Sequence, residues 1–343
     1  MSLLSQPLVS YAELTTSAPC RKDLWEASTA LHWKAIYLQD YRDQERMMHA
    51  RRSWMDDSTY VFQNQRYFDI DTSLLLVTAS IWPQLWQYHE MMTAARNSRS
   101  RDDRHGSLVL SSKRQDLLQS LEFIRMNAKE WHVDLKPAVW LLHEQCSMHL
   151  CVSLEDVQLL AGKEGEEECR RIFPVLNTWA KTPEARQALF HAGQILRAAK
   201  EYEKFMLRDA SAVAVYHASL IFWAYAIASR GDYNGAADPM SAHSNGSHNL
   251  DLIRLDDVEG PDIRRFLVLG RGLPCIQAHV QTEDGVVVRD VPLGEPAEVM
   301  RTTSRILQKQ YDGRERGNPP LVDNLSKLML LLGKAYVPNG KTR

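Results

Sequence analysis

Residues 210–228 read ASAVAVYHASLIFWAYAIA and contain no Asp, Glu, Lys or Arg. At a rise of about 1.5 Å per residue, a helix of this length could nearly cross the hydrocarbon core of a bilayer. Ala and Ser fill almost half of the stretch, however, and His217 lies in its first half, while Arg208 and Asp209 precede it and Arg230 follows it. A buried central helix has the same pattern. We therefore predict a core helix here, with a membrane span as the alternative.

Helical periodicity continues on the N-terminal side of this stretch. Apolar side chains recur every three or four residues over 22–38 and over 114–131, which places them on one face of a helix. The apolar stretch 73–95 contains Pro83, so we expect its helix to break or kink there. Residues 184–206 also predict a helix, with Gly193 inside it.

On the C-terminal side, Glu295-Pro296 predicts the start of another helix, because proline is tolerated in a first turn. The last helix is expected over 320–332, with Gly333 as its C-terminal stop. The main strand signal lies in 277–291, where Asp284-Gly285 separates two alternating segments.

These patterns predict an all-α fold: a multi-helix bundle with at most a small β-hairpin near 277–291. We expect a single helical, regulatory-type domain over residues 1–343. Two polar or glycine- and serine-rich stretches, 97–107 and 231–249, predict flexible loops within it.

Composition and charge argue against several classes of protein. The 343 residues carry 41 Lys and Arg against 43 Asp and Glu, a formal net charge of −2. Duplex-binding domains usually show a clear basic excess, so direct contact with nucleic acid is not expected. Five scattered cysteines favour free thiols in a reducing compartment over a disulfide framework. The first residues lack the pattern of a signal peptide.

The stretch 143–151, HEQCSMHLC, raises the possibility of a metal site. It lies in a predicted helix, where His143 and His149 are separated by about 9 Å along the axis. Zinc ligands lie about 2.0–2.3 Å from one ion, so the two histidines cannot share it. Cys146 lies on their face of the helix and Cys151 points elsewhere. We predict thiols and histidines packed in a helical core, and no metal ligands.

Other motifs give no catalytic or cofactor-binding residues. The chain has no GxSxG and no HExxH. LGRGLP at 269–274 is predicted to be a turn, and GKEGEEE at 162–168 lacks the features of a phosphate-binding loop. The acidic pairs at 56–57 and in FDID, 68–71, are expected to be helix caps or surface charges.

Residues 152–200, VSLEDVQLLAGKEGEEECRRIFPVLNTWAKTPEARQALFHAGQILRAAK, resemble the regulatory, or middle homology, region of fungal-specific transcription factors, especially those with paired two-Cys, two-His zinc fingers. Further segments resemble that family in the same order along the chain. They are PLVSYAELTTSAPCRKDLWEASTALHWKAIYL at 7–38, VYHASLIFWAYAIASRG at 215–231, RRFLVLGRGLPCI at 264–276, VPLGEPAEVM at 291–300 and NPPLVDNLSKLMLLLG at 318–333.

The resemblance implies an all-helical, nuclear regulatory domain of a transcription factor. It implies partners among protein co-regulators or other domains of the same factor, and a possible small-molecule effector, without membrane contact. In full-length relatives DNA binding and zinc belong to the fingers. This chain is expected to correspond to the C-terminal part of the domain, without fingers, so no cofactor is expected. A truncated gene product, a partial gene model and a diverged stand-alone protein all fit that expectation.

The alternative is a stand-alone ligand-binding protein or enzyme on the same fold, for example in secondary metabolism. A pocket between apolar helices would then be lined by polar and aromatic side chains. The first candidates are His191, Tyr216, His217 and Trp223, which lie in strongly apolar predicted helices. Each of them is also compatible with a place in the core.

Overall fold

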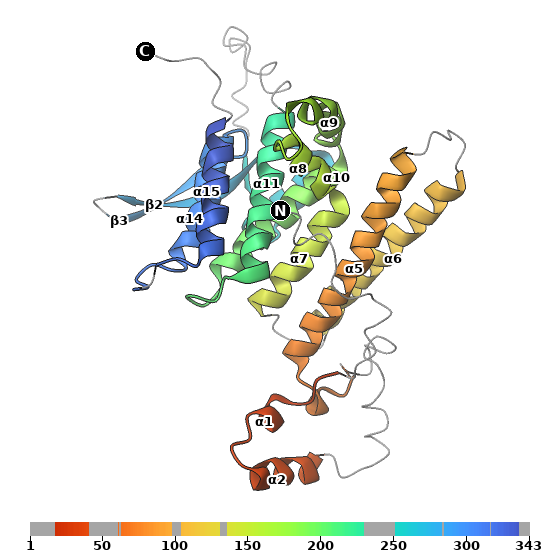
Figure 1. Ribbon diagram of the computed structural model, residues 1–343, viewed down its shortest axis with the longest axis vertical. Helices are drawn as coiled ribbons and strands as arrows, with labels where there is room; N and C mark the ends of the chain where they lie inside the picture. The colour runs from red at the N-terminus through yellow and green to blue at the C-terminus, as the bar shows by residue number, and fades with distance from the viewer. Residues whose placement is uncertain are drawn as a thin grey trace. The chain divides into compact units, whose positions relative to one another are not determined.

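The computed structural model describes residues 18–40, 61, 63–97, 104–130, 136–229, 251–282, 285–315 and 317–335. The chain divides into two compact units, Met1–Cys146 and Ser147–Arg343. Each unit is described by itself below. Helices dominate both units, and the second also contains a small sheet, which confirms the predicted fold class (Figure 1).

The first unit is built on two long helices that pack along each other, α5 (Ile70–Asn97) and α6 (Arg104–Glu130). Asp69 caps α5, because its carboxylate accepts hydrogen bonds from the Thr72 N–H and hydroxyl at 3.1 and 2.8 Å. Of the two acidic residues in FDID, Asp69 is therefore a helix cap, as predicted. The buried aliphatic and aromatic side chains of the pair include Leu74, Ile81, Leu85, Tyr88, Leu117, Leu121 and Ile124.

The chain before α5 forms shorter pieces. These are α1 (Lys22–Trp25), α2 (Ala30–Asp40) and a 3₁₀ turn, η2 (Gln65–Tyr67). A small apolar cluster joins Ala18, Val61, Tyr67 and Phe68. Helix α7 (Pro137–Cys151) contains the boundary between the two units.

The second unit surrounds α11 (Asp209–Ala228) with other helices (Figure 1). Helix α11 is long and apolar enough to span a membrane, but 78% of its apolar window is buried inside the protein, which favours the predicted core helix. The surrounding helices are α8 (Leu154–Leu160), α9 (Glu166–Trp179), α10 (Pro183–Lys200), α14 (Pro296–Lys309) and α15 (Pro320–Ala335).

A three-stranded sheet and α13 (Pro261–Leu269) complete the second unit. Strand β1 (Leu252–Arg254) runs parallel to β2 (Leu273–Thr282), which pairs antiparallel with β3 (Gly285–Pro292) from Cys275↔Pro292 to Thr282↔Gly285. The predicted hairpin is therefore longer than 277–291 and carries a third strand. Between α13 and β2, Gly270 adopts φ 67° and Gly272 φ 103°, which confirms the turn predicted at LGRGLP.

Several predicted helix limits are wrong. The stretch 22–38 is two helices, because the Thr29 hydroxyl accepts a hydrogen bond from the His32 N–H and starts α2 at Ala30. Helix α5 continues through Pro83 without a break, and α10 ends at Lys200 before the predicted limit of 206. Helix α15 continues two residues past Gly333.

Of the two predicted loops, 231–249 lies outside the described residues, as does 98–103 of the other. The described ends of 97–107 are helical: Asn97 ends α5, and residues 104–107 begin α6.

Candidate functional site

The Cys/His stretch 143–151 lies on α7, as predicted, and mostly faces inward. His143, Cys146 and His149 are at most 4% exposed, and Cys151 is partly exposed. The His143 ring stacks on Trp140, and its Nε2 lies 3.1 Å from the Leu121 carbonyl oxygen. Burial raises the pKa of the Cys146 thiol to about 12. These side chains are core residues in an apolar setting.

His149 is paired with a histidine far away in the sequence. Its Nε2 lies 3.2 Å from Nδ1 of His217 on α11, and the two rings meet edge to face. One ring nitrogen donates and the other accepts, so each histidine supplies the partner that the other needs in a buried site. Burial lowers the pKa of His217 to about 4, which keeps this imidazole neutral.

Of the other candidate side chains, Tyr216 lies beside this pair, with its ring centroid 6.1 Å from that of His217. Tyr216 is half-buried, and burial raises the pKa of its hydroxyl. His191 lies against the Phe190 ring on α10. Trp223 is 4% exposed in the middle of α11. Over the residues that the structure describes, no three His, Cys, Asp or Glu side chains are grouped as metal ligands would be.

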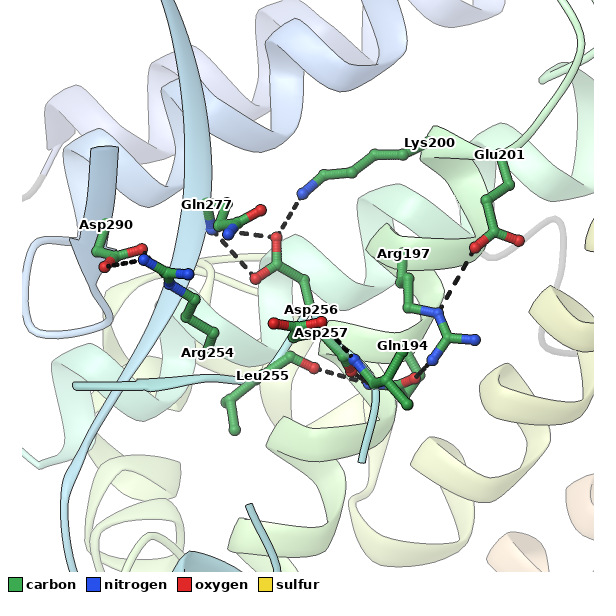
Figure 2. A network of polar contacts seen from close by, with 11 residues as sticks. Gln194, Arg197, Lys200, Glu201, Arg254, Leu255, Asp256, Asp257, Gln277 and Asp290 are labelled. Carbon is green, nitrogen blue, oxygen red and sulfur yellow. Dashed lines mark hydrogen bonds and ion pairs between the residues drawn. The ribbon is translucent and has the colours of Figure 1, made fainter. Parts of the chain in front are cut away.

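A second polar cluster, which sequence reasoning missed, centres on Asp256 in the segment between β1 and α13 (Figure 2). The Asp256 side chain is completely buried. Its carboxylate accepts a hydrogen bond from Lys200 Nζ at the end of α10, at 2.5 Å. It also accepts from the Gln277 N–H of β2, which lies 3.1 and 3.0 Å from its two oxygens. A buried carboxylate needs such donors, because its desolvation is unfavourable. Asp256 therefore joins α10 to the sheet.

Gln194 fixes the same segment from the middle of α10. Its Nε2 donates to the Leu255 carbonyl oxygen at 2.9 Å and to that of Asp257 at 2.7 Å (Figure 2). The neighbouring Gly193 lets this backbone approach, since a Cβ there would lie 2.3 Å from the Leu255 oxygen. Nearby, Arg254 of β1 pairs with Asp290 of β3 through two hydrogen bonds.

The polar contacts in these clusters hold helices and strands in place relative to one another. The rings of His149 and His217 bind each other, burial lowers the pKa of His217, and the Asp256 carboxylate is held by an ammonium and a backbone N–H. Gly193 and the Gln194–Leu255 contact could have been suspected from the sequence as a glycine inside a helix, which usually marks a close approach. Asp256 gives no such signal, because its burial depends on a partner 56 residues away.

The amino-acid sequence has a distant similarity to a known protein. Transcription factor 1 of Elsinoe fawcettii is 20% identical over 289 residues, which cover 79% of this chain. The chain is similar to a fungal transcription factor. It spans 29% of the length of that relative. No protein-family model matches the chain, and no solved structure matches it.

This similarity agrees at a coarse level with the family resemblance in the sequence. It extends over most of the chain and is not confined to one short motif.

Proposed function

We propose that this chain is a regulatory domain of a nuclear transcription regulator, of the middle homology type, which acts through protein contacts and not through catalysis. The observation that carries the proposal is the similarity to Transcription factor 1 over 79% of the chain. The composition agrees with it, because a net charge of −2 does not favour direct binding to nucleic acid.

The proposed mechanism uses the packed helices of the second unit. Helix α11 is enclosed by α8, α9, α10, α14 and α15, so the outer helices present their remaining faces to a partner. A partner or small-molecule effector shifts the domain between two states only by its difference in affinity for them. No cofactor is required for this function.

The test is a tethering experiment. The full chain is fused to a foreign DNA-binding domain and expressed in fungal cells that carry a matching reporter gene. We expect reporter output to rise or fall relative to the DNA-binding domain alone, and fluorescent fusions of the chain to enter the nucleus. A variant with a damaged core, Gly193→Ala, should lose the effect. Unchanged output with a stable, nuclear fusion would overturn the proposal.

A further inference from the structure

Helix α15 has an apolar face that remains uncovered within its own unit. Its buried face packs on α14 and α11 through residues such as Val322, Met329 and Gly333. Because an α-helix turns about 100° per residue, Leu328 and Leu331 lie away from that face. Leu328 is 42% exposed and Leu331 is 61% exposed. Contiguous apolar surface on the outside of a folded unit is typical of interaction sites.

The exposed leucines belong to an apolar stripe that is interrupted by the exposed Asn324 between Leu321 and Leu328. Leu321, Leu328 and Leu332 follow one another at steps of seven and four, and Leu321 and Leu332 are half-buried. Leu331 and Ala335 extend the stripe on its outer side, and both are exposed. This spacing is the one with which an amphipathic helix contacts a second helix. The α15 stripe, defined by these five residues, therefore fits a helical partner.

Two lysines border the α15 stripe. Lys327 and Lys334, seven residues apart, lie on the same edge of the helix and are exposed. In the described ranges neither ammonium is within ion-pair distance of a carboxylate. The acidic residue of α15, Asp323, is at its first turn, where it accepts a hydrogen bond from Asn318. Asp323 lies on this edge as well, four residues before Lys327, so the edge carries one net positive charge.

Helix α9 of a second copy would offer a poor complement to this surface. Phe173 and Val175 of α9 are exposed. They are two residues apart, so they point about 200° away from each other, to opposite sides of the helix. Its glutamates are offset by Arg170 and Arg171, which form ion pairs with Glu166 and Glu168 within the helix. A second copy would therefore bring little net negative charge to the lysines.

We propose that the α15 stripe binds an acidic amphipathic helix of another protein. Leucine or aromatic side chains of that helix lie in the stripe, and its Asp and Glu side chains face Lys327 and Lys334. The inference rests on the proposed function and specifies the chemistry of its partner. Complementary charge fixes orientation and discriminates against basic helices, while the apolar contacts supply most of the affinity.

The probe is a fluorescein-labelled synthetic helical peptide with leucines at three- and four-residue steps and glutamates along one edge. A second peptide has lysine in place of each glutamate. Fluorescence anisotropy measures binding of each peptide to the purified full chain at low and high salt. We expect the acidic peptide to bind, more weakly at high salt, and the basic peptide to bind at least about tenfold more weakly.

Variants locate the surface. Leu328→Gln and Leu331→Gln should each weaken binding of the acidic peptide about tenfold, as expected for the loss of one buried leucine contact. Lys327→Glu combined with Lys334→Glu should reverse the preference between the two peptides. Val268→Gln, at a side chain of α13 that is 74% exposed, is the matched control and should change nothing. All these positions are exposed, so thermal unfolding should stay as in the wild type.

The inference is overturned if the chain binds neither peptide, binds both equally, or keeps its affinity in the Leu328 and Leu331 variants. Sedimentation that shows a dimer lost on Leu331→Gln would also overturn it, because a second copy would then occupy the stripe. The tethered reporter separates the two proposals. Output that is insensitive to these variants, with no peptide binding, refutes the α15 site alone. Specific peptide binding with a silent reporter refutes the proposed function alone.

Discussion

At the scale of single residues, His217 ties the stability of the second unit to pH. Burial lowers its pKa to about 4, whereas an unfolded chain has a histidine pKa of about 6.5. Between these values the unfolded state binds the proton and the folded state does not. The stabilisation is therefore fully present above about pH 6.5 and is lost as the pH falls toward about 4, by up to about 3 kcal/mol.

His217→Gln should remove this part of the pH dependence, because a glutamine amide can hydrogen-bond to His149 but does not titrate. The measurement is urea unfolding at about pH 7 and about pH 5. Ser219→Ala is the control on the same helix, because the buried Ser219 hydroxyl donates to the Tyr216 carbonyl and does not titrate. This substitution should change the free energy of unfolding by the same amount at both pH values. A variant whose stability falls with pH as steeply as the wild type contradicts the assignment.

Gly193 is required by a backbone contact and not by its own conformation. An alanine Cβ would lie 2.3 Å from the Leu255 oxygen and 2.5 Å from its carbonyl carbon, and neither atom can move without shifting β1. We expect Gly193→Ala to lower the free energy of unfolding by about 3 kcal/mol.

The helical glycine Gly333 provides the comparison for that substitution. A Cβ there would lie 3.3 Å from the nearest atoms of Ala297 and Met300. The tight fit opposes a gain of about 1 kcal/mol in helix propensity. Gly333→Ala should therefore change stability by less than about 1 kcal/mol in chemical denaturation. Equal losses at the two glycines would refute the argument from backbone contact.

At the scale of secondary structure, the Asp256–Lys200 pair joins α10 to the sheet. Removing Lys200 leaves a fully buried carboxylate without its ammonium, so Lys200→Gln should destabilise the protein by about 3 kcal/mol. Adding Asp256→Asn should recover part of this loss, with a coupling energy above about 1 kcal/mol in a double-mutant cycle. The exposed Arg170–Glu166 pair is the control, with a coupling expected below about 0.5 kcal/mol. Additive losses at Lys200 and Asp256 would exclude the pairing.

Elements were predictable from the sequence where periodicity alone decides them. Helix α11 and the start of α14 at Pro296 followed from composition and helix-start rules. Helix α5 does not break at Pro83, because the loss of about 3 kcal/mol at a helix-interior proline is outweighed by burial of Ile81, Leu85 and neighbouring side chains. Gly333 was misjudged because it serves close packing against α14 and not helix termination.

The polar clusters were less predictable, because they depend on contacts between distant parts of the chain. His149 and His217 were both singled out in the sequence, but nothing in it indicated that they meet across 68 residues. Asp256 and Lys200 were missed altogether. The apolar stripe of 22–38 was recognised, but periodicity does not reveal whether a stripe is covered: Trp25 is 75% exposed and Leu31 is 81% exposed.

At the scale of the whole molecule, the five thiols report on the two compact units. All five cysteines are free, as predicted. Cys146 and Cys275 are fully buried, and burial raises the pKa of each thiol to about 12. Both should react with a thiol reagent only after local opening, whereas the three partly exposed cysteines, Cys20, Cys151 and Cys169, should react in the native chain.

Combining this labelling with Gly193→Ala tests whether the units open separately. Gly193 faces Leu255, whose N–H donates to the Cys275 carbonyl at 3.0 Å, and all three residues belong to the second unit. If Gly193→Ala lowers the free energy of unfolding of this unit by about 3 kcal/mol, the labelling rate of Cys275 should rise on the order of a hundredfold. Cys146 belongs to the first unit and should keep its rate. Peptide mass spectrometry after timed labelling resolves the two thiols, and equal acceleration of both would mean that the two units open as one.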